Sequence, residues 1–156
     1  MIVPQEIYHP LYTDTEKFII LITGGRGSGK SFNASTFIER LTFEMTPVEK
    51  IVHQILYTRY TMVSAGMSII PEMMEKIDLD GTTKYFKTTK TDIVNKMTKS
   101  RIMFRGIKTS SGNQTAKLKS IQGITTFVCD EAEEWTSEDE FDKIMLSIRK
   151  IGRAHV

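Results

Sequence analysis

The chain has 156 residues, 40% of them hydrophobic and 26% charged, with a formal net charge of +2, which predicts one globular domain with a substantial core. It has no apolar run near the roughly 18 residues that a membrane span requires, its start lacks the features of a signal peptide, and its single cysteine, Cys129, excludes an internal disulfide. We therefore expect a soluble, intracellular protein that does not associate with membranes. With one cysteine and three histidines, a structural zinc site is not expected.

The first part of the chain predicts a strand, a glycine-rich turn and a helix, in that order. Residues 18–23 read Phe-Ile-Ile-Leu-Ile-Thr, a continuous apolar run typical of a parallel strand that is covered on both faces. Glycines are frequent between residues 24 and 29. From Ser31 to Met45 the apolar residues recur at the spacing of one helical face.

The middle of the chain predicts a second strand, a second helix and a hairpin. The strand is expected at 54–60, and the helix between Val63 and Ile77, where Pro71 indicates a kink or a fresh start. Residues 92–95 and 101–105 have the pattern of two short strands joined by a turn.

The last part predicts a loop, a third buried strand and a helix. Residues 109–115 are polar and turn-forming, which favours a loop. The apolar run 124–129 predicts a strand that leads directly into two acidic residues. A final helix is expected to begin near Ser137, which has capping-box spacing to Glu140.

The glycine-rich turn fits the pattern Gly-x-x-x-x-Gly-Lys-Ser of a phosphate-binding loop. Glycines permit left-handed backbone and let amide groups approach a phosphate closely, and the helix that follows adds the positive end of its dipole. Lys30 is expected to reach the β- and γ-phosphates, and the Ser31 hydroxyl to coordinate Mg²⁺. The predicted nucleotide-binding residues are Gly24, Gly25, Arg26, Gly27, Ser28, Gly29, Lys30 and Ser31.

Binding and hydrolysis of a magnesium nucleotide also require acidic side chains, and the acidic pair after the third strand can supply them. Asp130 follows the apolar run directly, where it would hold the Mg²⁺ shell. Its neighbour Glu131 is suited to orient and partly deprotonate an attacking water. An acid in this second position favours hydrolysis over simple nucleotide binding.

Adenine is expected to be the base. Asp78-Leu-Asp-Gly81 matches a GTPase switch pattern, but no buried strand precedes it, and Asn95-Lys96 is not followed by the aspartate of a guanine-reading motif. Tyr8 and Tyr12, upstream of the first strand, could stack on adenine or serve in packing.

Charge is distributed unevenly along the chain. Between Lys84 and Lys119 there are ten basic residues and one acid, whereas the segment from Asp130 to Asp142 has eight acids and no lysine or arginine. The basic stretch predicts a surface that faces a polyanion, with an ordinary solvated face as the alternative.

Several segments together resemble one family. They are Ile19–Ser31, Leu56–Arg59, Ile102–Gly106, and Lys119–Ile124 leading to Asp130–Glu134. This combination resembles the amino-terminal ATPase half of the large terminase subunit of tailed bacteriophages, the motor that packages DNA into a preformed capsid. The similarity covers nearly the whole chain, from about residue 5 to 150.

The resemblance implies a fold and a set of roles. The fold would be α/β, a P-loop NTPase with a RecA-like, mostly parallel sheet flanked by helices and a basic hairpin insertion. Lys30 and Ser31 become the Walker A contacts, Asp130 the Walker B aspartate and Glu131 the catalytic glutamate, with ATP and Mg²⁺ as cofactors. Arg26 either senses the γ-phosphate or is a solvated arginine. Lys117 and Lys119 lie where some members carry a basic residue acting in trans, and contact with the DNA backbone is the alternative.

The resemblance also implies partners and organisation. We expect double-stranded DNA, a portal protein and a small terminase subunit as partners, a homo-oligomeric ring on the portal, and a location in the cytoplasm of the infected bacterium and transiently at the procapsid portal. Residues 1–150 would form an incomplete ATPase domain, 151–156 a non-native tail, and the nuclease half would be absent. A helicase-like DNA-dependent ATPase and a nucleotide-binding module without turnover remain alternatives.

Overall fold

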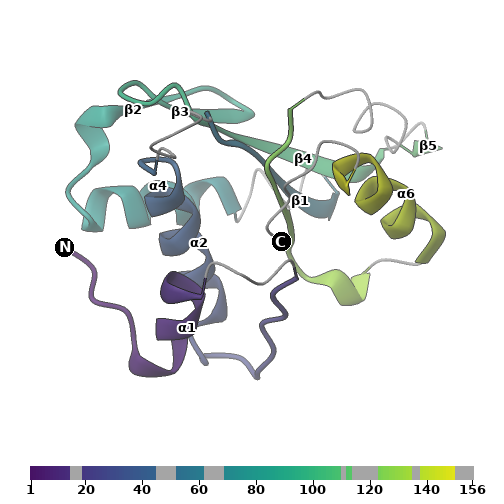
Figure 1. The fold of residues 1–156 in the computed structure, drawn as a ribbon, viewed down its shortest axis with the longest axis horizontal. Helices are drawn as coiled ribbons and strands as arrows, with labels where there is room; N and C mark the ends of the chain where they lie inside the picture. Colours follow the sequence, from purple (N-terminus) through teal and green to yellow (C-terminus); the bar gives the residue numbers. More distant parts are fainter. Residues whose placement is uncertain are drawn as a thin grey trace.

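The computed structural model describes residues 1–14, 19–44, 52–61, 69–109, 112–113, 123–134 and 138–149. Its helices are η1 (Glu6–Tyr8), α1 (His9–Thr13), α2 (Lys30–Leu41), α4 (Ile70–Leu79), η3 (Thr83–Tyr85), η4 (Ala132–Glu134) and α6 (Glu138–Arg149). Its strands are β1 (Gln54–Thr61), β2 (Phe86–Thr88), β3 (Asp92–Asn95), β4 (Arg101–Thr109), β5 (Gly112–Asn113) and β6 (Thr126–Cys129). Figure 1 shows these elements as one sheet with helices on both sides.

The described strands form one mixed sheet in the order β2-β3-β4-β1-β6, with β5 paired to β4. β1 runs parallel to both β4 and β6, whereas the pairs β2–β3, β3–β4 and β4–β5 are antiparallel. The expected mostly parallel sheet is therefore wrong over the described strands: only the three strands β4, β1 and β6 are parallel. The antiparallel pairing arises because short turns join β2, β3 and β4, and a short turn reverses the chain.

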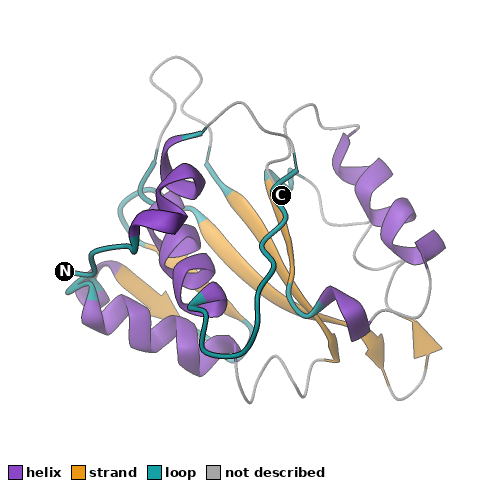
Figure 2. Cartoon of the chain, turned by 90° about the horizontal axis from the view of Figure 1, so that it is seen from below, coloured by secondary structure: helices purple, strands orange, loops and turns teal. Residues whose placement is uncertain are grey.

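The core lies between the sheet and the helices α2 and α4. Alternate residues of three adjacent strands, Ile55, Tyr57, Ile93, Ile102 and Phe104, face Ile38 and Leu41 of α2 and Met73 and Ile77 of α4. Residues paired across neighbouring strands, such as Ile55 with Ile102, point to the same face, so the centre of this side of the sheet is apolar. The two helices cover it together, as Figure 2 shows from another side.

α6 covers part of the opposite face. Leu56 and Phe127 are paired across β1 and β6 and are fully buried, and the Phe127 ring lies 6.2 Å from that of Phe141 on α6. Met145, one turn further along α6, is also buried. Among the described residues, no helix is both long and apolar enough to cross a membrane.

Two predicted helices are confirmed with shifted bounds. The helix expected from Ser31 to Met45 is α2, which begins at Lys30 and ends at Leu41. The helix expected around Pro71 is α4, in which the proline occupies the first turn, where its fixed φ suits a helix start and its missing N–H has no partner to lose. Residues 63–68 of that prediction lie outside the described residues.

The strands at 54–60 and 124–129 and the hairpin of 92–95 with 101–105 are confirmed as β1, β6 and β3–β4. The loop expected at 109–115 is wrong in part, because Thr109 ends β4 and Gly112 pairs with it in β5. The final helix is confirmed as α6 from Glu138. Its predicted capping residue Ser137 and the tail 151–156 lie outside the described residues.

The strand predicted at 18–23 is wrong over its described part. Residues 19–25 have no regular secondary structure, and Leu21 is 82% exposed although a core strand was expected. In both views this segment passes between α2 and β6 (Figures 1 and 2). An apolar run becomes a strand only when a neighbour accepts its backbone hydrogen bonds, and no described strand pairs with these residues.

Candidate nucleotide-binding site

The glycine-rich turn has the backbone that the sequence pattern predicts. Gly24, Gly27 and Gly29 have φ angles of 150°, 75° and 81°, positive values that glycine adopts far more readily than residues with a Cβ. A Cβ at Gly24 would also lie only 2.9 Å from the Ser28 hydroxyl oxygen. The positive φ and the nearby Ser28 hydroxyl therefore both disfavour a side chain at position 24.

The turn leads directly into the first turn of α2. Gly29 precedes the helix in left-handed conformation, and its carbonyl accepts the Asn33 amide at 2.9 Å. The amides of the first helical turn have no partner within the helix, so this end attracts an anion. The Lys30 ammonium folds back over the turn and donates to the carbonyl oxygens of Gly24 and, at 3.3 Å, Gly25. Ser31 and Arg26 are exposed beside it.

The N-terminal helices η1 and α1 hold the turn from outside. The Tyr8 hydroxyl donates to the Ser28 carbonyl at 2.7 Å, and the Tyr12 hydroxyl to the Asn33 carbonyl at 3.2 Å. The Arg40 guanidinium lies over the Tyr12 ring, 5.7 Å from its centre. Tyr12 is therefore engaged in packing.

A cavity of about 310 Å³ adjoins the turn. Its lining combines apolar side chains with the amides of a glutamine and an asparagine: Val3, Gln5, Gly29, Phe32 and Asn33. The buried Oδ1 atom of Asn33 has no hydrogen-bond partner. This cavity offers apolar contact and two amide side chains next to the predicted phosphate-binding turn.

The register between β1 and β6 brings a basic residue to the acidic pair. Thr58 pairs with Cys129, and the Asp130 amide donates to the Thr58 carbonyl at 3.0 Å. The next residue of β1, Arg59, therefore lies beside Asp130, and its Nε is 3.2 Å from the Asp130 Oδ2. The Nη2 atom of Arg59 also forms an ion pair with Glu131 Oε1.

The backbone of Glu131 is unusual. Its φ is 50°, a left-handed conformation that a non-glycine residue adopts at a cost of about 1–3 kcal/mol. Such a conformation persists only where surrounding contacts hold it. The ion pair with Arg59 is one such contact.

Burial shapes the electrostatics around Asp130. Burial raises the pKa of the Asp130 carboxyl above its ordinary value, against the attraction of Arg59. Burial also raises the pKa of Glu72 in the first turn of α4, and the negative charge of Asp130 adds to the effect. The first turn of α4 therefore lies close to the acidic pair.

The turn and the acidic pair share one side of the sheet. Tyr57 and Val128 belong to the face that α2 and α4 cover. Arg59 and Asp130 follow them by two residues each, and side chains two apart in a strand point the same way. Arg59 and Asp130 therefore extend toward the side on which α2 lies, whose first turn carries Lys30 and Ser31.

The donor set suits Mg²⁺ bound together with phosphates. Within the part of the chain that the structure describes, no cluster of three or more His, Cys, Asp or Glu side chains could hold a metal ion by itself. Mg²⁺ keeps most of its waters and uses one or two protein oxygens plus substrate phosphates. One hydroxyl, Ser31, and one carboxylate, Asp130, fit that requirement.

A second acidic cluster holds the far end of α2. The Arg40 guanidinium contacts both carboxylate oxygens of Asp80 at 3.0 and 3.1 Å, and the Ile2 amide donates to Asp80 at 2.7 Å. Beside them, Glu39 is fully buried and accepts a 2.6 Å hydrogen bond from Thr82. Burial and the neighbouring Asp80 raise the pKa of Glu39 to about 8. This cluster fixes the N-terminal segment and the end of α4 to α2.

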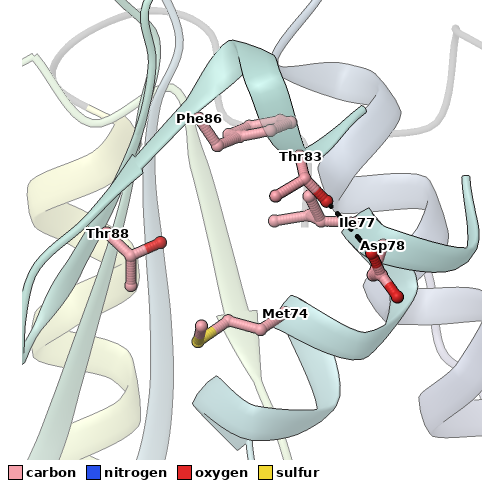
Figure 3. A pocket seen from close by; sticks show the side chains of 6 residues that line it. All are labelled: Met74, Ile77, Asp78, Thr83, Phe86 and Thr88. Carbon is pink, nitrogen blue, oxygen red and sulfur yellow. Dashed lines mark hydrogen bonds between the residues drawn. The ribbon is translucent and has the colours of Figure 1, made fainter. Parts of the chain in front are cut away.

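Another cavity, of about 260 Å³, lies between α4, η3 and β2. Figure 3 shows apolar side chains on its walls, with Thr83 donating to Asp78 at 3.4 Å on one rim. Its lining residues are Met74, Ile77, Asp78, Thr83, Phe86 and Thr88. None of the predicted site residues contributes to it.

The described part of the basic stretch lies mostly on the surface. Its exposed members are Lys84, Lys87, Lys90, Lys96, Lys99 and Arg101. The one acid of the stretch, Asp92, is buried between Arg101 at 3.1 Å and Arg105 at 2.8 Å. Lys117 and Lys119, the candidates for a trans-acting residue, lie outside the described residues.

Arg59 is the site residue that sequence reasoning missed. In the sequence it belongs to the segment Leu56–Arg59 that resembles the family, and the pattern assigns it no role. Its position at the end of a strand parallel to the acid-bearing strand was a usable signal, because the carboxyl ends of parallel strands meet at one edge of a sheet.

Comparison with known proteins gives one family. The family model described as phage terminase large subunit matches residues 16–155. A search of curated proteins found no significant match.

Proposed function

The chain belongs to the phage terminase large subunit family, and we propose that it is the ATPase motor domain of such a subunit, with a P-loop, RecA-like fold over residues 1–150. Family membership supports a role in phage DNA packaging. The observation that carries the ATPase proposal is the pairing of two features on one side of the sheet. These are a glycine turn with three positive φ angles at the start of α2, and an acidic pair at the end of β6.

In this proposal the turn binds the phosphates of ATP. Backbone amides of residues 24–31 and the start of α2 supply the anion site. The Lys30 ammonium, which contacts the Gly24 and Gly25 carbonyls, turns toward the β- and γ-phosphates, because a phosphate oxygen is a stronger acceptor for it than a carbonyl. The adjoining cavity with Gln5, Phe32 and Asn33 receives the base.

Hydrolysis then depends on the acidic pair. Ser31 and Asp130 would hold Mg²⁺, which would supply positive charge to the phosphates. Glu131 would orient a water and accept its proton as the water oxygen bonds to the γ-phosphorus of ATP and the bond from that phosphorus to the β-phosphate oxygen breaks, which releases ADP. Arg26, which is exposed within the turn, is proposed to meet charge on the γ-phosphate, with a solvated arginine as the alternative.

Duplex DNA is the proposed polymer on which the motor acts. Lys87, Val94 and Arg101 form one row across β2, β3 and β4, on the face opposite α2 and α4. With the exposed lysines of the adjacent turns, this row suits a phosphate backbone. The proposed setting is a homo-oligomeric ring on the portal with a small terminase subunit, in the host cytoplasm during capsid assembly.

One observation favours a second candidate, a module that binds ATP without hydrolysing it. Glu131, the proposed catalytic residue, forms an ion pair with Arg59, and the carboxylate oxygen that meets the guanidinium is not free to contact a water. In that case ATP would be retained on a filter without phosphate release.

A binding and turnover assay separates the candidates. The purified chain should retain radiolabelled ATP in the presence of Mg²⁺, and Lys30→Ala should lose that retention. Lys84→Ala, which removes an exposed lysine remote from the turn, is the matched control and should bind as the wild type does. Equal ATP retention by the wild type and Lys30→Ala would contradict the proposal.

A further inference from the structure

The end of α2 carries a carboxyl group that the proposed nucleotide site does not use. Glu39 is fully buried, and its Oε1 atom accepts a 2.6 Å hydrogen bond from the Thr82 hydroxyl. Its Oε2 atom is buried as well, and no donor within the described part of the chain contacts it. A buried ionised carboxylate needs donors at its oxygens, because an uncompensated charge away from water is costly. The surroundings of Glu39 therefore suit the protonated, neutral carboxyl.

The neighbouring carboxylate, Asp80, already has its donors. Its side chain is 5% exposed, and its two oxygens accept hydrogen bonds from the Arg40 guanidinium at 3.0 and 3.1 Å. The Ile2 amide donates to the same carboxylate at 2.7 Å. One guanidinium therefore balances one carboxylate, and the charges of the cluster cancel only while Glu39 keeps its proton.

The Ile2–Gln5 segment is attached to this cluster through its backbone. The Ile2 amide contacts Asp80, and the Ile2 carbonyl accepts a hydrogen bond from the Nη2 atom of Arg40. The same Nη2 atom also donates to Asp80, so a carbonyl and a carboxylate share one donor group. Further along the segment, Val3 and Gln5 line the cavity of about 310 Å³ beside the glycine-rich turn. The cluster therefore holds a segment that supplies two residues of the cavity wall.

We propose that Glu39, Asp80 and Arg40 form a latch that holds the Ile2–Gln5 segment while Glu39 is protonated and releases it when Glu39 ionises. Ionised Glu39 needs a donor, and Arg40 is the cation that faces it. A carboxylate is a stronger acceptor than a carbonyl, so the guanidinium turns from the Ile2 carbonyl toward Glu39. Two adjacent carboxylates also repel each other, which weakens the contact of Asp80 with the Ile2 amide. Release takes two residues out of the cavity wall.

The groups around Glu39 set the pH at which the latch acts. The charged and titratable groups that face it are Tyr12 on α1, Arg40 on α2 and Asp80 after α4. Burial, followed by the hydrogen bond with Asp80, raises the pKa of Glu39 to about 8, whereas Thr82 and Arg40 act in the opposite direction. The segment is therefore held well below pH 8 and released well above it.

Nuclear magnetic resonance of the purified chain tests the latch. The ¹³C resonance of the Glu39 carboxyl reports its ionisation, and exchange of the Ile2 amide with water reports the hydrogen bond to Asp80. Expressed as a protection factor relative to an unfolded peptide, Ile2 protection should fall about tenfold to a hundredfold between about pH 6 and pH 9, the range expected for loss of two hydrogen bonds. Its midpoint should coincide with that of the Glu39 carboxyl, a comparison that needs no variant.

Two variants complete the experiment. Glu39→Gln keeps the shape of the protonated carboxyl and cannot ionise, so Ile2 protection should stay constant across the same pH range. Glu44→Gln, which changes an exposed glutamate beyond the end of α2, should follow the wild type.

Three results would overturn the latch. Ionisation of Glu39 without a change at Ile2 would show that the segment stays attached. Equal loss of Ile2 protection in the wild type and Glu39→Gln would show that another group releases it. A parallel loss at Ile102 and Phe104 in the core of the sheet would show general unfolding instead of local release. The proposed function survives each of these results, because it depends on the glycine-rich turn and the acidic pair.

Discussion

Replacing Glu39 by glutamine should remove the loss of stability that Glu39 causes as the pH rises from 4.5 to about 8. Glu39 is fully buried on α2, and its surroundings are the Thr82 hydroxyl, the Asp80 carboxylate, Arg40 and Tyr12. Burial, followed by the hydrogen bond with Asp80, raises its pKa from 4.5 to about 8. The folded chain therefore binds the Glu39 proton more tightly than the unfolded chain does.

The sign of the effect follows from this difference. Below pH 4.5 the carboxyl is protonated in both states, and its contribution to stability is fully present. As the pH rises from 4.5 to about 8 the unfolded chain releases the proton first, so the free energy of unfolding falls. Asp80 acts in the opposite direction at lower pH. Although partial burial raises its pKa, hydrogen bonds from Arg40, Glu39 and the Ile2 amide outweigh burial and lower that pKa to about 2, so its contribution is present above pH 3.8 and is lost toward pH 2.

The size of the change in the free energy of unfolding is limited, because only one proton is involved. A single group changes the free energy of unfolding by at most about 1.4 kcal/mol per pH unit. Entry of water on ionisation relieves part of the penalty of burial, so we expect a loss of a few kcal/mol across the window. Glutamine is close in shape to the protonated carboxyl and still accepts the Thr82 hydrogen bond. Glu39→Gln should therefore match the wild type near pH 5 and exceed it near pH 8.

Urea unfolding followed by circular dichroism at pH 5, 6, 7 and 8 measures this difference. Glu44→Gln is the matched control, because Glu44 is an exposed glutamate just beyond the end of α2, and it should follow the wild-type curve. Parallel pH profiles for the wild type and Glu39→Gln would refute the reasoning, since they would mean that Glu39 ionises in the folded chain as it does in the unfolded one.

Three further predictions concern the segment before α2, the turn and the cysteine. Leu21→Ala should change the free energy of unfolding by less than about 0.5 kcal/mol because Leu21 is exposed, whereas Phe104→Ala in the core should cost about 3–5 kcal/mol; similar losses in urea unfolding would show that Leu21 is buried. Gly24→Ala should weaken ATP retention on a filter more than Gly27→Ala. Both glycines have positive φ angles, but only a Cβ at Gly24 would lie close to another atom, the Ser28 hydroxyl oxygen at 2.9 Å. Equal ATP retention by the two variants would contradict this argument. Burial, with the charge of Asp130, raises the pKa of the Cys129 thiol to about 12, so iodoacetamide should react with it at pH 8 at least about a hundredfold more slowly than with a free thiol, and a rate near that of the free thiol would contradict the burial.

The sequence predicted the elements whose formation depends on local pattern. The run 54–60, the pair 92–95 and 101–105, and the proline start of α4 were all predictable, because alternation, turn residues and proline geometry act within a few residues. Residues 19–23 show the limit of such reasoning. Their composition suits a buried strand, but strand formation depends on a neighbour that composition does not specify.

The candidate site divides in the same way. The glycine turn was predictable because positive φ angles select glycine locally. The contacts of Arg59 were not predictable, because they depend on the register of β1 against β6. This register brings Arg59 to Asp130, which lies 71 positions further along the chain. The pKa shifts of Asp80 and Glu39 similarly depend on the packing of α2 against the end of α4.

The most direct test of the proposed ATPase is to separate ATP binding from phosphate release in one variant. Glu131→Gln keeps the size and polarity of the side chain but cannot accept a proton from water. With Mg²⁺ and duplex DNA present, the account predicts that the wild type releases phosphate, and that Glu131→Gln retains ATP but releases phosphate at least about a hundredfold more slowly. Undiminished phosphate release by Glu131→Gln would contradict it.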